Sequence, residues 1–319
     1  MQAMAALLQR EWREHLFGFG WTPVILLGLL VLVTCLGLAI AGSGTANISY
    51  SSEITDGENT SREEFEFRDS LISLARFVDY DNWSDAELSE IMDQFRISVA
   101  RPFQYVYLMV AIFVLLGSMY EDRRDRTVLF WKSMPVSDTE TVLSKLIAAA
   151  WVAPVAVIAA VVAAQVLLMA AISVLIWAED LGSVARLWWN SGLLTGVIEL
   201  AVGYLIQGLW ALPLYAWLLA VSAAVPRVPF VWALLAPVAA VAIERVAFGT
   251  DVVRNFAYAH TQFAALPRPA DTHDQIVIPG VGLADQFGLL VTGQMWSGVA
   301  IGMLLLWAAI FFRSRNNDL

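Results

Sequence analysis

The sequence predicts an all-α polytopic membrane protein: six transmembrane helices, an N-terminal interfacial helix, a short helix at the cytoplasmic surface and a small external helical region. Of its 319 residues, 59% are hydrophobic and only 15% are charged, whereas soluble domains contain about 25% charged residues. Thirteen tryptophans suit a chain with membrane interfaces. Apolar runs of spanning length recur between polar segments, so we expect residues 1–319 to form a single transmembrane domain.

Residues 1–20 are predicted to form an amphipathic helix in the membrane interface. Its apolar side holds Met4, Leu7, Leu8, Trp12 and Leu16, and its polar side holds Gln9, Arg10, Arg13 and Glu14. An ordinary cytoplasmic tail is the alternative interpretation. Residues 21–41 are predicted as the first span. A cleaved signal peptide ending near Ala39-Ile40-Ala41 is its alternative, which the acidic leader and the long apolar run disfavour.

Residues 43–101 are predicted to form an external, acidic helical region. The segment carries thirteen Asp and Glu against five Arg. Two capping boxes, Ser61 with Glu64 and Ser84 with Glu87, each precede apolar residues at helical spacing and predict two helices. Pro102 is expected to open the second span, residues 103–120.

Residues 121–141 form a polar segment that the charge pattern places in the cytoplasm. Both lysines of the chain, Lys132 and Lys145, lie in or next to it. Residues 125–132 place four apolar side chains between charges, which predicts a short helix on the membrane surface; a solvated loop is the alternative. Ser137 and Glu140 form a capping box that predicts the start of the next membrane helix.

The remaining spans follow from apolar length and helix breakers. The third, residues 142–177, is longer than one crossing requires and is expected to project or to bend near Pro154. The fourth lies within residues 191–225 and is expected to break at Pro213, the fifth ends near Glu244, and the sixth covers residues 295–312. Residues 247–293 are too interrupted to span and are predicted to be external or re-entrant. Six spans place both termini in the cytoplasm, with arginines next to the cytoplasmic ends.

Few residues suggest chemistry inside the membrane. Glu199 and Gln207 share one face of the fourth span, and an intramembrane carboxylate indicates function unless water or a neighbouring helix satisfies it near the interface. His260 and His273 lie near Asp271 and Asp274 in residues 247–293, but too few strong ligands accompany them to predict a metal site. No nucleophile-elbow or zinc-protease motif occurs, and neither lysine follows a glycine as a phosphate-binding loop requires. We therefore predict neither an enzyme nor direct ATP binding, and the net charge of −10 disfavours nucleic acid.

The polar segment resembles the cytoplasmic loop of the ATP-binding-cassette type-2 permease family. The resemblance covers about 25 positions and is carried by Glu121-Asp122-Arg123, Arg126-Thr127, Ser133-Met134-Pro135-Val136-Ser137 and Lys145. Arg126 replaces the usual Gly, and Asp138 stands where a base is common. The predicted order of six spans, with an N-terminal interfacial helix and a broken segment before the last span, is similar to that family as well.

The resemblance implies a permease subunit of an exporter in a bacterial inner membrane. A coupling helix in the loop would dock on a separate ATPase subunit that binds ATP and Mg²⁺, and two permease copies, as a homodimer, would enclose the substrate path. The implied docking residues are Arg123, Arg124, Arg126, Leu129, Phe130 and Trp131. The implied anchors of the loop are Glu121, Pro135, Ser137 and Lys145, and Glu199 and Gln207 become candidates for the substrate path.

Two other functions stay open from the residues alone. One is a membrane-embedded enzyme that uses Glu199 or the external His and Asp residues. The other is a non-transporting assembly or sensor protein whose acidic external region binds a partner.

Overall fold

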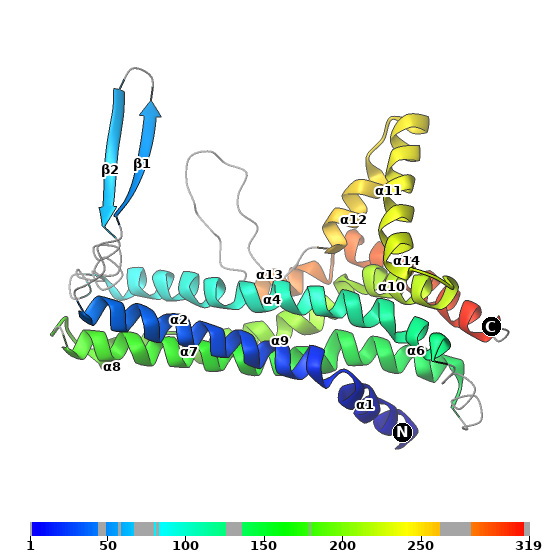
Figure 1. The fold of residues 1–319 in the computed structure, drawn as a ribbon, viewed down its shortest axis with the longest axis horizontal. Coiled ribbons are helices and arrows are strands. Elements are labelled where there is room, and N and C mark those ends of the chain that lie inside the picture. The colour runs from blue at the N-terminus through cyan, green and yellow to red at the C-terminus, as the bar shows by residue number, and fades with distance from the viewer. Residues whose placement is uncertain are drawn as a thin grey trace. The chain divides into compact units, whose positions relative to one another are not determined.

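The computed structural model describes residues 2–43, 49–56, 59–66, 80, 83–125, 136–178, 180–261 and 282–315 (Figure 1). Within these residues the fold is helical apart from one hairpin. Six helical stretches are long and apolar enough to cross a membrane: Leu16–Gly37, Asp85–Arg124, Asp138–Ala178, Val184–Trp210, Pro229–Phe248 and Gly293–Arg315. The predicted all-α polytopic class is confirmed, and the chain is a multi-pass membrane protein.

The N-terminal segment forms the expected amphipathic helix. Helix α1 (Gln2–Glu14) leads through a π-helical turn, η1 (Leu16–Trp21), into helix α2 (Thr22–Ser43). Leu7 is buried as its apolar position predicts, but Glu11 on the same side is buried as well. In α2 the large apolar side chains are mostly exposed, as suits a helix that contacts lipid.

The prediction of a helix that begins near Ser61, the first of two in residues 43–101, is wrong. Strands β1 (Ser49–Asp56) and β2 (Asn59–Glu66) form an antiparallel hairpin in which Ser49 pairs with Glu66 and Asp56 with Asn59. Ser61 and Glu64 therefore lie in a strand rather than at a helix start. The paired ends Asp56 and Asn59 leave Gly57-Glu58 as the linking dipeptide, and a two-residue link that begins with glycine is a hairpin signal that outweighs the S-x-x-E spacing. The apolar residues expected further along that helix, at 71–78, lie outside the described residues.

The second predicted external helix is confirmed, but it does not end before the membrane. In its capping box the Ser84 Oγ accepts from the Glu87 N–H at 3.3 Å, and Glu87 accepts from the Ser84 N–H at 2.8 Å. Helix α4 (Asp85–Arg124) then continues through Pro102, where a new span was expected to open. Membrane helices tolerate an internal proline because neighbouring groups satisfy the freed carbonyl. At 1.5 Å per residue α4 is about 60 Å long, so it extends beyond a hydrocarbon core of about 30 Å.

The third span shows the predicted excess length and irregularity. Helices α6 (Asp138–Ile147) and α7 (Ala153–Ala178) are joined by a π-helical segment, η3 (Ala148–Val152), immediately before Pro154. After helix α8 (Val184–Trp189), the predicted fourth span, within residues 191–225, divides into α9 (Leu193–Trp210) and α10 (Leu212–Ala224). Pro213 lies in the first turn of α10, so the predicted break is confirmed.

Residues after the fifth span form short helices. Helix α11 (Pro229–Phe248) ends at Gly249, whose φ of 66° is left-handed, and α12 (Val252–Thr261) follows. The Glu244 carboxylate caps α12 by accepting from the N–H groups of Val252 and Val253 at 2.7 and 2.8 Å. Helix α13 (Leu283–Leu289) precedes α14 (Gly293–Arg315). The position of α12 and α13 relative to the membrane stays a prediction.

The chain divides into two compact units, each with its own core. The first contains Met1–Pro23, Ala100–Ala159 and Val197–Leu319, and the second contains Val24–Val99 and Ala160–Gly196. In the first unit α10 packs along α14, and α6 contacts α1 and α14. The core of the second unit consists of Tyr80, Leu88, Met92, Met169, Ile176 and Leu187.

Two glycines of α14 make the close packing in the first unit possible. Gly298 and Gly302 form a G-x-x-x-G pair, a spacing that allows membrane helices to approach closely. A Cβ at Gly298 would lie 2.3 Å from His260 Cε1, and one at Gly302 would lie 2.7 Å from Leu212 Cγ and 3.2 Å from the Leu212 backbone carbon. Side chains larger than hydrogen therefore do not fit at either position.

We predict that Gly302→Ala lowers the thermal stability of the detergent-purified chain. Forcing a methyl group against Leu212 costs about 1–3 kcal/mol, because the nearby backbone cannot yield freely. Gly28→Ala in α2 is the matched control, since no described atom lies within 4 Å of its added Cβ. A melting temperature for Gly302→Ala at or above that of Gly28→Ala would contradict the packing argument.

Candidate functional site

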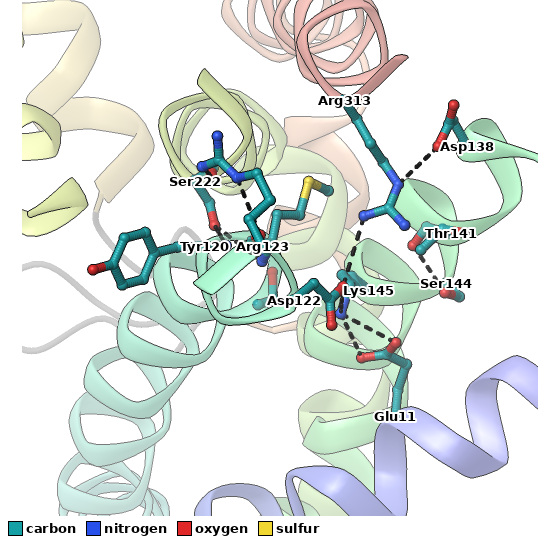
Figure 2. Close-up of polar contacts among 12 residues, drawn as sticks. Glu11, Tyr120, Asp122, Arg123, Asp138, Thr141, Ser144, Lys145, Ser222 and Arg313 are labelled. Atoms are coloured by element: carbon teal, nitrogen blue, oxygen red, sulfur yellow. Dashed lines mark hydrogen bonds and ion pairs between the residues drawn. The ribbon is translucent and has the colours of Figure 1, made fainter. Parts of the chain in front are cut away.

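The candidate site is a group of buried charges at the ends of four helices. Lys145 in α6, whose side chain is 2% exposed, places Nζ 3.3 Å from Oε1 of Glu11 and 3.5 Å from Oδ2 of Asp122. Arg313 in α14 lies 3.7 Å from the same Asp122 oxygen, and its Nε donates to Asp138 Oδ1 at 3.0 Å (Figure 2). We call Glu11, Asp122, Asp138, Lys145 and Arg313 the ionic cluster.

The ionic cluster is close to neutral and joins elements that are distant in sequence. Its three carboxylates face two cations, and Arg10 adds a third positive charge 3.9 Å from Asp122. Its residues come from α1, α4, α6 and α14, and all of these residues lie in the first unit. Removing one partner from a buried ion pair is strongly destabilising because it leaves a charge without compensation. The cluster therefore fixes these four helix ends relative to one another.

Burial also sets the protonation of the α1 residues. Burial raises the pKa of the Glu11 carboxyl, and the positive charge of Lys145 partly offsets this effect. His15 lies 3.7 Å from Glu11, but burial, and then the Lys145 charge, lower its pKa. At neutral pH His15 is therefore uncharged, and Lys145 is the closest cation to Glu11.

A second set of polar contacts holds the end of α4 against the end of α10. Arg123 donates to the Ser222 carbonyl, and both residues are labelled in Figure 2. It also donates to the Val225 carbonyl at 2.8 Å. The Ser222 hydroxyl donates to the Leu116 carbonyl at 2.7 Å and lies 3.1 Å from the N–H groups of Met119 and Tyr120. The last carbonyls of α10, which lack helical partners, are thus satisfied by a side chain of α4.

These contacts border residues 126–135 on both sides. The chain enters that segment after α4, which carries Asp122 and Arg123, and leaves it before α6, which carries Asp138 and Lys145. The α6 end is fixed further by the predicted capping box. Ser137 Oγ accepts from the Glu140 N–H at 3.1 Å, and Glu140 accepts from the Ser137 N–H at 2.9 Å. The residues on both sides of 126–135 are therefore held by contacts with other helices.

Two of the residues implied by the resemblance, Lys145 and Arg123, have partners within the chain. Lys145 is buried in an ionic contact as an anchor would be, but its partner on α4 is Asp122, because Glu121 is exposed. Arg123, expected to face a partner, is occupied by carbonyls of α10, whereas the Arg124 side chain is 59% exposed. The other residues implied in docking or anchoring, Arg126, Leu129, Phe130, Trp131 and Pro135, lie outside the described residues.

Sequence reasoning identified Lys145 as a site residue but missed the four other members of the ionic cluster: Glu11, Asp122, Asp138 and Arg313. A signal existed for Glu11, because it follows Leu7 by four residues and therefore interrupts the apolar side of α1. Arg313 was interpreted only as a base at the membrane boundary. No local pattern distinguishes Asp122 from Glu121, since the choice depends on which side of α4 faces α6.

Glu199 and Gln207 lie together on α9, outside the ionic cluster. Gln207 is 2% exposed, whereas Glu199 is partly exposed. The Glu199 backbone carbonyl accepts from Gln286 Nε2 of α13 at 3.1 Å. This contact joins α9 to α13, so the Glu199 backbone lies next to the end of residues 247–293, which were predicted to be external or re-entrant.

His260 has a packing role in the described structure. Its Nδ1 lies 2.7 Å from the Trp210 carbonyl and must carry the proton, and Trp210 Nε1 donates to the Ala259 carbonyl at 2.8 Å. The imidazole is buried between the Trp210 and Phe256 rings, with Gly298 alongside. Burial lowers the pKa of His260, although the bond to Trp210 partly opposes this. His273, Asp271 and Asp274 lie outside the described residues.

We predict that Lys145→Ala destabilises the purified chain by about 3–5 kcal/mol, because it leaves Glu11 and Asp122 buried without their shared cation. Arg124→Ala, which removes an exposed positive charge from the same region, should change stability much less, because exposed charges contribute little. Thermal unfolding in detergent checks both variants. Equal losses for the two variants would contradict the role of Lys145 as the central cation.

We predict that acid weakens the packing of α12 against Trp210, which we call the docked state of α12. Because the pKa of docked His260 lies below its ordinary value of 6.5, the undocked form binds more protons as the pH falls below 6.5. Stability of the docked helix is therefore complete above that pH and decreases below it. Amide hydrogen exchange of residues 252–261, corrected for its intrinsic pH dependence, should increase between pH 7.5 and 5.5. His260→Asn, which can donate but does not titrate in this range, should remove the increase; persistence would contradict the assignment.

Comparison with known proteins assigns no family to this chain. No protein-family model, curated protein or solved structure matches it. The functional conclusion therefore depends on the residues and on the geometry of the site.

Proposed function

We propose that this chain is the membrane-spanning permease subunit of an ATP-binding-cassette exporter. Two copies would form the transport path, and a separate subunit would hydrolyse ATP. The observation that carries the proposal is that the residues flanking 126–135 are held on both sides: Asp122 of α4 by Lys145 and Arg313, and Asp138 of α6 by Arg313. A segment rich in bases and aromatics, with both ends held firmly, is suited to receive force from a partner.

The contacts provide a physical route for that force. Displacing the segment moves the end of α4 and the start of α6, and the ion pairs of Lys145 and Arg313 pass the displacement to α1 and α14. An ATPase that changes conformation on binding nucleotide would thereby favour one arrangement of the spans over another. A segment attached only by flexible chain would absorb the same movement without transmitting it.

The energy source in this proposal is the partner. The sequence has no G-x-x-x-x-G-K phosphate loop, so ATP and Mg²⁺ are assigned to the ATPase subunit. The concentration of arginines and lysines around residues 123–145 supports a cytoplasmic position for the segment, with both termini on the same side of a bacterial inner membrane.

The docking surface is narrower than the sequence alone suggests. Arg124, Arg126, Leu129, Phe130 and Trp131 keep the proposed docking role. Arg123 joins the anchors instead, because the carbonyls of α10 already occupy its guanidinium. Glu199 and Gln207 remain the proposed side chains of the cargo path, as polar groups on one membrane helix next to α13.

We predict that Phe130→Ala combined with Trp131→Ala abolishes co-purification of an ATPase subunit while leaving membrane insertion intact. Removing two aromatic anchors eliminates most of the apolar contact expected at the centre of a docking surface. The measurement is vanadate-sensitive ATP hydrolysis in the affinity-purified complex, with subunits identified by mass spectrometry. Trp189→Ala is the matched control, because Trp189 is 90% exposed on α8 and is not part of the proposed surface.

Two outcomes would contradict the proposal. If the double variant retains the ATPase, docking does not involve the aromatic pair. If wild-type chain purified from its native membrane carries no ATPase activity, the permease assignment itself fails.

A further inference from the structure

In the third span the Ala149 carbonyl loses the backbone donor that a regular α-helix would give it. In the π-helical segment η3 the Ala153 N–H donates to the Ala148 carbonyl, five residues back, instead of the Ala149 carbonyl, four residues back. The next donor in the π-helical pattern would be residue 154, but Pro154 has no N–H. Ala149 is buried, so its carbonyl needs another donor.

Tyr107 of α4 supplies that donor. Its hydroxyl donates to the Ala149 carbonyl at 2.7 Å, and both residues are buried. The Tyr215 hydroxyl lies 3.3 Å from the Tyr107 oxygen and can donate to it. The buried phenol therefore satisfies the particular carbonyl that the π-helical register and Pro154 leave without a partner.

The interruption lies between two parts of one continuous helical stretch. On one side α6 carries Lys145 and begins at the Ser137 capping box; on the other side α7 begins. A neighbouring contact encloses the same segment: Trp151 Nε1 lies 3.3 Å from the Leu205 carbonyl, and its indole occupies space that a Cβ at Gly208 would fill. A π-helical turn followed by proline has fewer axial hydrogen bonds than regular helix and bends more readily.

We propose that residues 148–154 form a hinge between α6 and α7, and that Tyr107 is the positioning residue whose hydroxyl holds this hinge in one geometry. The hinge follows from contacts within this chain. Its use in transport, where α6 would tilt with the docking segment while α7 stays in place, rests on the proposed function.

The hydrogen bond is tested by a double-mutant cycle on the purified chain. Tyr107→Phe should lower the melting temperature by about 3–6 °C, because it leaves a buried carbonyl unpaired. Pro154→Ala restores an N–H next to that carbonyl, so the double variant should recover most of the loss. Tyr215→Phe is the matched control: it removes a buried hydroxyl nearby but leaves the bond to Ala149 in place.

The hinge is tested by pulsed electron paramagnetic resonance. Spin labels at Thr139→Cys and Ala159→Cys, two exposed positions about 30 Å apart along the helix, report its bending in a Cys35→Ser background that removes the single native cysteine. Tyr107→Phe should broaden the distance distribution of the folded protein, and adding Pro154→Ala should narrow it again. A residue that contributes only to global stability would change the melting temperature without changing this distribution.

Each outcome decides the proposal without cargo or ATPase. The proposal is supported if Tyr107→Phe lowers the melting temperature and broadens the distance distribution, and if adding Pro154→Ala reverses both changes. A double variant no more stable than Tyr107→Phe, or an unchanged distance distribution, overturns it. If Tyr107→Phe yields no folded protein, recovery of folded protein by Pro154→Ala is the supporting result, and failure to recover overturns the proposal. Since neither measurement involves transport, the hinge can fail while the permease assignment stands, or the reverse.

Discussion

The rest of the site depends on the ion pairs that the buried Lys145 ammonium makes with Glu11 and Asp122. The ammonium lies between carboxylates of α1 and α4, and the Asp122 carboxylate also faces Arg313 of α14. Desolvated charges are tolerated only when their partners stay in place, so the ion pairs constrain every helix that contributes one. The segment that follows α4 and precedes α6 is therefore attached to a fixed base, and this attachment makes a force-receiving role physically reasonable.

The other buried polar contacts of the first unit solve a common problem, which is that helix ends and irregular turns leave backbone groups without partners. Arg123 satisfies carbonyls at the end of α10, and Tyr107 satisfies the Ala149 carbonyl, five residues before Pro154. Glu244 accepts from N–H groups at the start of α12. Each side chain comes from a different helix than the group it satisfies. These three polar side chains therefore hold irregular backbone or helix ends in place.

The sequence was informative where structure depends on nearby residues. Six spans, the break at Pro213 and the capping boxes at Ser84 and Ser137 were predictable, because length, proline chemistry and i, i+3 spacing are local. The Ser61 prediction failed because a nearby two-residue link that begins with Gly57 favours a hairpin over a helix start. The ionic cluster was only partly predictable. Glu11 meets Lys145 across 134 positions of sequence, and the choice of Asp122 over Glu121 depends on a rotation of about 100° around α4.

In the proposed function, residues 126–135, which lie between the helices α4 and α6 that carry Asp122 and Lys145, face the cytoplasm, where an ATPase can reach them. The measurement is labelling of Lys132→Cys, in the Cys35→Ser background, with a membrane-impermeant maleimide. Trp189→Cys, on the predicted external side, serves as the reference. The account predicts that residue 189 reacts in intact cells and that residue 132 reacts only after permeabilisation. Reaction of residue 132 in intact cells would contradict it.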